Sequence, residues 1–195
     1  MLGTFASVEI SSSRPSPRRT DVGHAELVGG VEKREMVLAD YNPAWAGQYR
    51  DHEQRIRRAL GPSTRVEHIG STAVPGLTAK PIIDVLVLVA DVTAEEDYLD
   101  PLVAAGYELR VREPGRRMVR TPARDVHVHI LERTNPAAED YLVLRDRLRV
   151  DEADRQLYAD TKRDLMTREW SDMNAYAAAK TAVIEDIKER GRAAR

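Results

Sequence analysis

The chain has 195 residues, a length that suits one domain with or without an appendage, and 42% of them are hydrophobic, which is enough for a sizeable core. It contains no cysteine, which excludes disulfides, thiolate–zinc sites and cysteine nucleophiles. Its formal net charge is −2, and it shows no apolar run of membrane-spanning length and no hydrophobic leader, so we expect a cytoplasmic protein that binds neither membranes nor nucleic acid.

The first 33 residues differ in composition from the rest of the chain. The stretch SSSRPSPRRTDVG is rich in Ser, Pro and Arg and has no sustained periodicity, so it cannot bury enough apolar area to offset its ordering entropy. This predicts a disordered tail over residues 1–33 and a folded domain over residues 34–195. Met36 directly precedes the first strand-like run, and we expect it to be the natural start, which N-terminal sequencing of the natively expressed protein tests.

Three strands and one helix are predicted in the first half of the domain. The helix has Pro43 in its first turn, Gly61 just past its end and an apolar stripe at helical spacing. The run PIIDVLVLV has the continuous β-branched pattern of a central strand that is buried on both faces. The strands cover residues 36–41, 64–70 and 81–89, and the helix covers residues 43–61.

A helix and three further strands follow, and the remainder of the chain is helical. Thr93 and Glu96 make a capping box at the start of that helix, and Gly106 ends it. Turn signals at Pro114 and Pro122 separate the strands. The helices cover residues 93–106, 136–149, 153–170 and 172–191, and the strands cover residues 107–112, 116–121 and 124–132. A mixed sheet followed by helices predicts an α+β or α/β fold and not a repeat array.

Gly70, Ser71 and Asp84 are the first candidate site residues. A glycine where a strand ends lets a ligand approach the backbone, and N–H groups beside Ser71 suit a phosphate, although a plain turn is the simpler interpretation. Asp84 stands in an apolar strand, where a carboxylate is costly unless it is paired or bound to a metal. It caps a turn, forms a structural ion pair with an arginine or Lys80, or binds a divalent cation. Lys80 itself, directly before the strand of Asp84, is either a surface lysine or a phosphate contact at the same end of that strand.

Two histidines on the last predicted strand form the second candidate set. Strand alternation places Asp125, His127 and His129 on one face of RDVHVHILE. Two imidazoles at this spacing can share one metal ion, or one of them can act as a general base; a polar, solvent-facing side is the simpler interpretation. Arginines of the hairpin region such as Arg110 and Arg112 either contact phosphates or form a solvated face.

Five stretches of the chain carry a family resemblance: VLADYNPAWAGQYRDHEQRIRRALG, VEHIGSTAVPGLTAKPIIDVLV, HVHILE, LRDRLR and AYAAAKTAVI. Together they resemble the GrpB-like family of the nucleotidyltransferase-fold superfamily, and the resemblance covers roughly Val37 to Lys188. The block EHIGSTAVPGLTAKPIID is the most distinctive of them. The resemblance implies an α+β fold, namely a nucleotidyltransferase-like mixed β-sheet with flanking helices and a helical C-terminal part.

The superfamily pattern is a Gly-Ser turn, a strand with aspartate–any–acid, and a third acid on a later strand, whose carboxylates hold divalent metal ions. Gly70 and Ser71 match the turn, and Asp84 matches the first acid. Leu86 stands where the second acid falls, and leucine cannot ligate a metal, so we expect one metal ion and not two. The third position falls to Asp125 or to the histidine pair.

The resemblance implies a choice between an enzyme and a binding module. The enzyme binds a nucleoside triphosphate and a divalent metal ion, Mg²⁺ or Mn²⁺, and transfers a nucleotidyl group to an unknown small-molecule acceptor; a metal-dependent ligase or hydrolase that reuses the cleft is a variant of it. The module is a non-catalytic nucleotide-binding or chaperone-like protein that has lost the second acid, because a related domain occurs fused to dephospho-coenzyme A kinase, where it has a suspected folding-aid role. The enzyme hypothesis assigns nucleotide binding to Gly70, Ser71 and Lys80, and both catalysis and metal binding to Asp84, His127 and His129.

Overall fold

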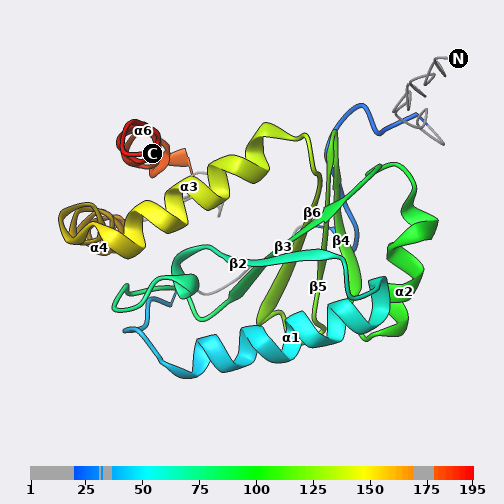
Figure 1. Ribbon diagram of the computed structural model, residues 1–195. Coiled ribbons are helices and arrows are strands. Elements are labelled where there is room, and N and C mark those ends of the chain that lie inside the picture. The colour runs from blue at the N-terminus through cyan, green and yellow to red at the C-terminus, as the bar shows by residue number, and fades with distance from the viewer. Residues whose placement is uncertain (1–19, 31, 33–36, 169–177) are drawn as a thin grey trace, which may run out of the picture.

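A mixed β-sheet with helices on both faces forms the body of the protein (Figure 1). The computed structural model describes residues 20–30, 32, 37–168 and 178–195. The six strands of this part lie in the order β1-β4-β5-β6-β3-β2; β3 and β6 run parallel, and the other neighbours are antiparallel. Their bounds are β1 (Glu26–Leu27), β2 (Arg65–Ile69), β3 (Ile83–Val89), β4 (Glu108–Glu113), β5 (Arg116–Arg120) and β6 (Val126–Glu132). The expected α+β class is confirmed.

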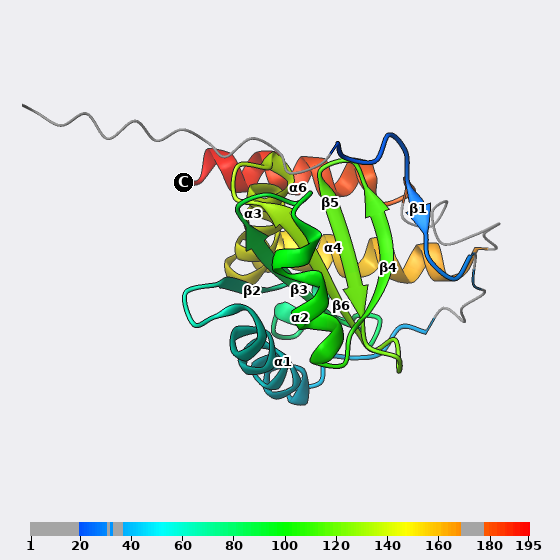
Figure 2. The ribbon, with the colours of Figure 1, turned by 90° about the vertical axis from the view of Figure 1, so that its right-hand side faces the viewer.

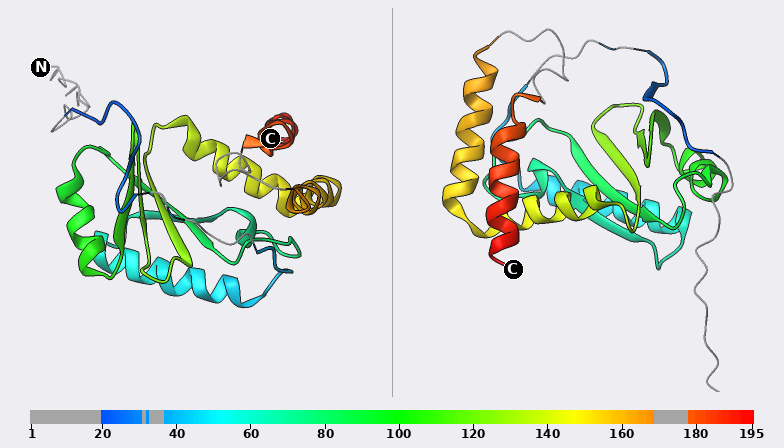
Figure 3. Two further views of the ribbon diagram at one scale, coloured as in Figure 1. Left: turned by 180° about the vertical axis from the view of Figure 1, so that it is seen from behind. Right: turned by 90° about the horizontal axis from the view of Figure 1, so that it is seen from above.

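The helices divide between the two faces of the sheet. Helices α1 (Ala44–Leu60) and α2 (Leu99–Ala104) cover one face, and α3 (Pro136–Val150) covers the other, with α4 (Glu152–Met166) and α6 (Thr181–Ala193) packed beyond it (Figures 1 and 3). The helical C-terminal part, which consists of α3, α4 and α6, therefore stands over a single face of the sheet. At the start of α3, the side chain of Asn135 acts as the cap by accepting a hydrogen bond from the N–H of Ala137 at 3.0 Å, and Pro136 follows as the first helical residue.

Strand β3 has a different core on each side. Val85 and Val87 pack into the cluster that includes Trp45 of α1, whereas Leu86 and Leu88 pack with Leu142 of α3. Successive side chains of a strand point to opposite faces, so Asp84, two residues before Leu86, lies on the α3 face together with Leu86. Leu86 is 0% exposed, which means that the position of the missing second acid is part of the hydrophobic core.

Most of the predicted elements are confirmed, and the region of residues 93–106 is an exception. It contains a 3₁₀ turn (Glu95–Asp97) followed by the short helix α2, and the predicted capping box is wrong: the hydroxyl of Thr93 donates to Asp91 at 2.6 Å. Glu95 accounts for the difference between the predicted helix and the observed turn. Its buried carboxylate accepts two hydrogen bonds from Arg112 at 2.9 Å and one from Arg117 at 2.8 Å. Arginines 112 and 117 are therefore structural, and the phosphate-contact interpretation of Arg112 is not supported.

Two other predicted elements are only partly described. Of the strand predicted over residues 36–41, the described part forms a single bridge, between Ala39 and Ala79. Met36 and residues 169–177, which include parts of two predicted helices, lie outside the described residues.

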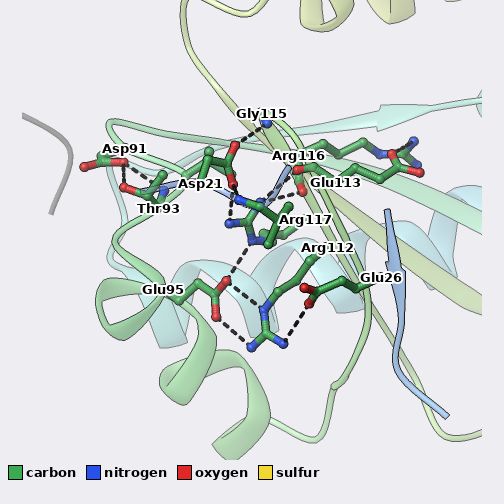
Figure 4. A network of polar contacts seen from close by, with 12 residues as sticks. Asp21, Glu26, Asp91, Thr93, Glu95, Arg112, Glu113, Gly115, Arg116 and Arg117 are labelled. Carbon is green, nitrogen blue, oxygen red and sulfur yellow. Dashed lines mark hydrogen bonds and ion pairs between the residues drawn. The ribbon is translucent and has the colours of Figure 1, made fainter. Parts of the chain in front are cut away.

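An N-terminal strap, residues 20–30 with Glu32, runs along the outer edge of the sheet. Strand β1 pairs with β4 (Figure 2), and Asp21 accepts hydrogen bonds from Arg117 at 2.7 Å and from the N–H of Gly115 at 2.6 Å (Figure 4). Glu32 accepts two hydrogen bonds from Arg120, at 2.8 and 2.9 Å, which lower its pKa to about 2. The predicted disordered tail is therefore wrong for this part of the segment, while residues 1–19 lie outside the described residues.

Removal of the Asp21 carboxylate is expected to destabilise the fold. The Asp21→Ala change takes one of two carboxylate partners from Arg117, whose side chain is 2% exposed, and we expect the free energy of unfolding to fall by about 2 kcal/mol. Glu26→Ala is the matched control on the same strap, because the Glu26–Arg112 contact is 3.9 Å long and largely exposed, so the expected loss is below about 0.5 kcal/mol. Urea denaturation measures both, and equal effects would contradict a strap anchored through Asp21.

Candidate functional site

The turn after β2 brings the backbone against a carboxylate. Gly70 has φ = 71°, and the 3₁₀ turn Ser71–Ala73 follows it. A Cβ atom on residue 70 would lie 2.6 Å from Oδ2 of Asp84, which is closer than real Cβ atoms come to any neighbour. The glycine is therefore required twice, by its left-handed backbone and by the space that the Asp84 side chain occupies.

Asp84 meets both histidines of β6. Nε2 of His129 lies 3.1 Å from Oδ1 of Asp84, and Nδ1 of His127 lies 3.7 Å from the same oxygen. Burial raises the pKa of Asp84, but the hydrogen bond from His129 and the neighbouring imidazoles outweigh it and hold this pKa below its ordinary value. The carboxylate is therefore ionised at neutral pH. The structure therefore places these three side chains together, and their chemical roles remain a prediction.

The three side chains form a donor set for one metal ion. One ligand atom from each of Asp84, His127 and His129 lies within 4.8 Å of the others. Two imidazole nitrogens and one carboxylate oxygen suit a transition metal such as Zn²⁺, Fe²⁺ or Mn²⁺, whereas Mg²⁺ prefers oxygen ligands alone. The residues present fit a divalent ion, and they fit Mn²⁺ better than Mg²⁺.

Two other acids, Glu67 and the predicted candidate Asp125, do not join this cluster. Glu67 lies beside Leu86 in the sheet register, but its carboxylate accepts a hydrogen bond from Arg145 of α3 at 2.9 Å. Asp125 lies in the turn before β6 and accepts a hydrogen bond from the hydroxyl of Thr121 at 2.6 Å. Of the two candidates for the third position, the histidine pair lies beside Asp84, and Asp125 does not.

His68 belongs to the opposite face of the sheet. Its ring stacks on Tyr49 of α1 with 4.5 Å between the centroids, and one ring nitrogen lies 3.2 Å from the hydroxyl of Thr72. Burial lowers the pKa of His68 to about 4, so this histidine is neutral. It is part of the core under α1 and does not join the histidines of β6.

A cavity of about 250 Å³ opens between the Gly70–Ser71 turn, Asp84 and the C-terminal helices. Among the described residues, Asp84 is the one acidic side chain in its lining. The cationic side chains of the lining come from the loop before β3, from α3, from α4 and from the start of α6; they are Lys80, Arg145, Lys162 and Lys180. Its apolar wall consists of Leu38, Ile82, Tyr141, Leu144, Leu148, Tyr158 and Ile184. All three predicted nucleotide-binding residues line this cavity, which places them together but does not test what they bind.

Lys162 is the functional candidate that the sequence interpretation missed. It is 3% exposed, its ammonium lies 3.2 Å from the hydroxyl of Ser71, and it donates to the carbonyl of Thr78. Its Nζ also lies 4.7 Å from the ring centroid of Tyr158, but no carboxylate of the described residues lies within ion-pair distance of it. A buried cation without an anionic partner, at the wall of a cavity, is a site for an anion.

Burial also shifts the titration of this lysine. Desolvation lowers the pKa of Lys162 to about 7, and the positive charges of Lys180 and Arg163 contribute to the shift. Desolvation also lowers the pKa of Lys180, and the negative charge of Asp84 opposes it. The sequence signal for Lys162 was its place in the apolar stripe of α4, between Tyr158 and Leu165.

Comparisons with known proteins place the chain in a family. The model of the family described as "GrpB protein" matches residues 35–190. The UPF0157 protein SCO7215 of Streptomyces coelicolor is 58% identical over 178 residues, which cover 91% of this chain and 96% of the relative. The crystal structure of the conserved protein GrpB from Enterococcus faecalis superposes with a TM-score of 0.69 at 32% identity, over 80% of this chain and 96% of that one.

More distant matches have more specific names. A dephospho-CoA kinase of Mycolicibacterium paratuberculosis is 29% identical over 190 residues, which cover 82% of this chain and 47% of the kinase. The Cid1 poly(U) polymerase with bound MgGTP superposes with a TM-score of 0.47 at 14% identity, over 67% of this chain and 45% of that one. No helix in the described ranges is long and apolar enough to cross a membrane.

Substitution of Gly70 is expected to disturb the Asp84 carboxylate. Gly70→Ala adds a methyl group 2.6 Å from Oδ2 of Asp84 at a residue with φ = 71°, whereas Gly76→Ala meets a similar φ of 77° with nothing within 4 Å. We expect Gly76→Ala to lower the free energy of unfolding by about 1 kcal/mol through backbone strain, and Gly70→Ala to lower it by at least about 2 kcal/mol more. Denaturant unfolding measures both.

The double variant Gly70→Ala, Asp84→Ala identifies the cause. Removal of the carboxylate is expected to remove the part of the excess cost that comes from the contact with Asp84, while the part from the Gly70 backbone (φ = 71°, ψ = −174°) remains. An excess that does not shrink without the carboxylate would show that Gly70 is not required to make room for Asp84.

Proposed function

The chain belongs to the GrpB protein family, and we propose that its cavity binds the phosphates of a nucleoside triphosphate beside one divalent metal ion and transfers a nucleotidyl group to a small-molecule acceptor. The observation that carries this proposal is Lys162, a buried cation that faces the same cavity as the Asp84 centre and has no carboxylate partner among the described residues. Phosphate oxygens are anions that satisfy such a lysine, and a metal ion matches the carboxylate and imidazole donors.

One group of residues binds the phosphates, and another binds the metal ion. Ser71, Lys80 and Lys162 hold the phosphates, together with the backbone at Gly70, whose missing side chain leaves the turn open. Asp84 holds the metal with the histidines of β6. When bound, the ion neutralises phosphate charge and lowers the pKa of the acceptor hydroxyl. As the hydroxyl oxygen bonds to the α-phosphorus, its proton passes to water and the bond to pyrophosphate breaks. The lysines stabilise the charge on the departing pyrophosphate.

A non-catalytic nucleotide-binding or chaperone-like module is the second candidate. Leu86 favours it, because a fully buried leucine under α3 occupies the position of the second metal-binding acid. A single ion can hold a nucleotide in place without activating an acceptor. Release of pyrophosphate with a broad set of acceptors and Mn²⁺ separates the two: turnover supports the enzyme, and tight binding without turnover supports the module.

Loss of the Asp84 charge is expected to abolish metal binding. Asp84→Asn keeps the shape of the side chain and removes its charge, and we expect the affinity for Mn²⁺ and Zn²⁺ to fall at least about 100-fold in calorimetry. Asp125→Asn is the matched control, since Asp125 directly precedes β6, the strand of the two histidines, but bonds to Thr121 outside the cluster. Unchanged metal affinity in Asp84→Asn, with a lower melting temperature in the absence of metal, would assign Asp84 to a structural ion pair with the histidines.

Replacement of Lys162 is expected to raise stability and lower binding. Lys162→Met removes, at similar volume, a buried cation that has no carboxylate partner in the described part of the chain. The melting temperature should therefore rise, while the affinity for inorganic triphosphate falls about tenfold or more at pH 7. Lys188→Met is the control: this lysine is also buried, but it pairs with Asp140 at 2.8 Å and Glu185 at 2.7 Å, so its loss should lower stability and leave binding unchanged. A destabilised Lys162→Met with normal binding would refute the anion site.

The same pair of proteins gives a pH test of the anion site. Because the pKa of Lys162 in the empty cavity is about 7, the site must take up a proton to hold an anion at higher pH, with Lys180 and Arg163 as the facing cations. Triphosphate binding by the unmodified protein should therefore weaken between pH 7 and 9 more steeply than binding by Lys162→Met. Calorimetry at pH 8 in two buffers of different ionisation enthalpy measures the proton uptake, and equal uptake by both proteins would contradict this role.

A further inference from the structure

The hydrogen bonds of His129 determine which of its nitrogens carries the proton. Nη2 of Arg116, the first residue of β5, lies 2.7 Å from Nδ1 of His129. A guanidinium only donates hydrogen bonds, so Nδ1 is an acceptor and carries no proton. The single proton of the neutral ring is then on Nε2, which donates to Oδ1 of Asp84 at 3.1 Å. Arg116, His129 and Asp84 thus form a directed chain of hydrogen bonds.

This chain excludes a metal ion from His129. A metal needs a nitrogen lone pair, and in this arrangement Nε2 carries a proton while the lone pair of Nδ1 faces Arg116. Ligation through Nε2 requires the proton to move to Nδ1, where it would meet the N–H of Arg116. Ligation through Nδ1 requires the guanidinium to leave. Arg116 and a metal ion therefore compete for the same imidazole.

Arg116 is held more loosely than its neighbour in the strand. Its Nε is buried without a hydrogen-bond partner, and its other contact is with Glu113 at 3.1 Å, in a pair whose side chains are 28% and 36% exposed. Arg117, by contrast, has a side chain that is 2% exposed and bonds to Asp21, Glu95 and two backbone carbonyls. An arginine with an unsatisfied buried N–H and an exposed partner loses little when it moves away.

We propose that Arg116 is a latch on the metal centre: docked on His129, it fixes the proton on Nε2 and disfavours the metal ion, and its release allows Asp84, His127 and His129 to ligate together. This rests on the proposed metal site. Arg116 acts through His129 and is thus a positioning residue. Its effect is opposite to that of a ligand, because its loss strengthens metal binding.

The tautomer of His129 is the first test, and it needs no metal. Ring ¹⁵N shifts of the metal-free protein at a fixed neutral pH should show His129 with its proton on Nε2, and Arg116→Ala should shift the ring toward a mixture of both tautomers. A proton on Nδ1 of His129 in the unmodified protein would overturn the proposal.

Metal affinity is the second test. In calorimetry with Zn²⁺ and Mn²⁺, we expect Arg116→Ala to bind at least about tenfold more tightly than the unmodified protein. Arg133→Ala is the matched control: it removes one positive charge from an exposed residue just beyond β6. A gain that comes only from the lost charge should appear in both variants and shrink at high salt, whereas the gain from the latch should persist there.

The outcomes separate the latch from the metal site itself. Equal metal affinity in the unmodified protein and Arg116→Ala, or equal gains in Arg116→Ala and Arg133→Ala, would overturn the latch and leave the metal site standing. Absence of binding at the Asp84 centre in all three proteins would overturn both.

Discussion

The close approach of the Gly70 backbone to the Asp84 carboxylate is the contact on which the rest of the site depends. It lets a charged group stand at the mouth of an otherwise apolar strand, because no side chain on residue 70 competes for its space. The parallel pairing of β3 with β6 then sets His127 and His129 beside this carboxylate. Position 86, the next residue on the same face, is a leucine buried under α3. Among the described residues, the ligand atoms gathered at this point come from one carboxylate and two imidazoles.

The charges around the cavity follow from where the C-terminal helices pack. Helices α3, α4 and α6 stand over the face that carries Asp84, and they bring lysines and arginine to it (Figure 1). Arg145 is neutralised by Glu67, but the hydrogen-bond partners of Lys162 among the described residues are neutral, so positive charge remains in the cavity that Asp84 also lines. A ligand that combines phosphate oxygens with a divalent cation would neutralise both the Lys162 ammonium and the Asp84 carboxylate. At the edge of the sheet next to the strap, by contrast, the arginines form ion pairs: Arg117 pairs with Asp21 of the strap and with Glu95.

Local patterns predicted the elements, and contacts between distant segments account for what they missed. The period-two alternation of β3 and β6 correctly placed Asp84 with the histidines and on the same face as Leu86, because strand geometry leaves two choices for each side chain. The alternation of β2 puts His68 on the α1 face, where its ring stacks on Tyr49. Lys162 could not be assigned from α4 alone, since its burial arises only when that helix packs on the Ser71 turn. The strap was missed because Ser, Pro and Arg dominate its neighbourhood. Its acids are held by contacts that the local sequence does not reveal: Asp21 bonds to Arg117, which lies 96 residues further along the chain.

The central claim is that one cavity holds a metal ion at Asp84 and phosphates at Lys162. Anomalous diffraction from a crystal grown with Mn²⁺ and a non-hydrolysable nucleoside triphosphate tests it most directly. The account predicts one ion bound by Asp84 with the histidines of β6, the guanidinium of Arg116 withdrawn from His129, and phosphate oxygens within hydrogen-bond distance of Lys162. An ion bound by other residues, or phosphates that bind away from Lys162, would contradict it.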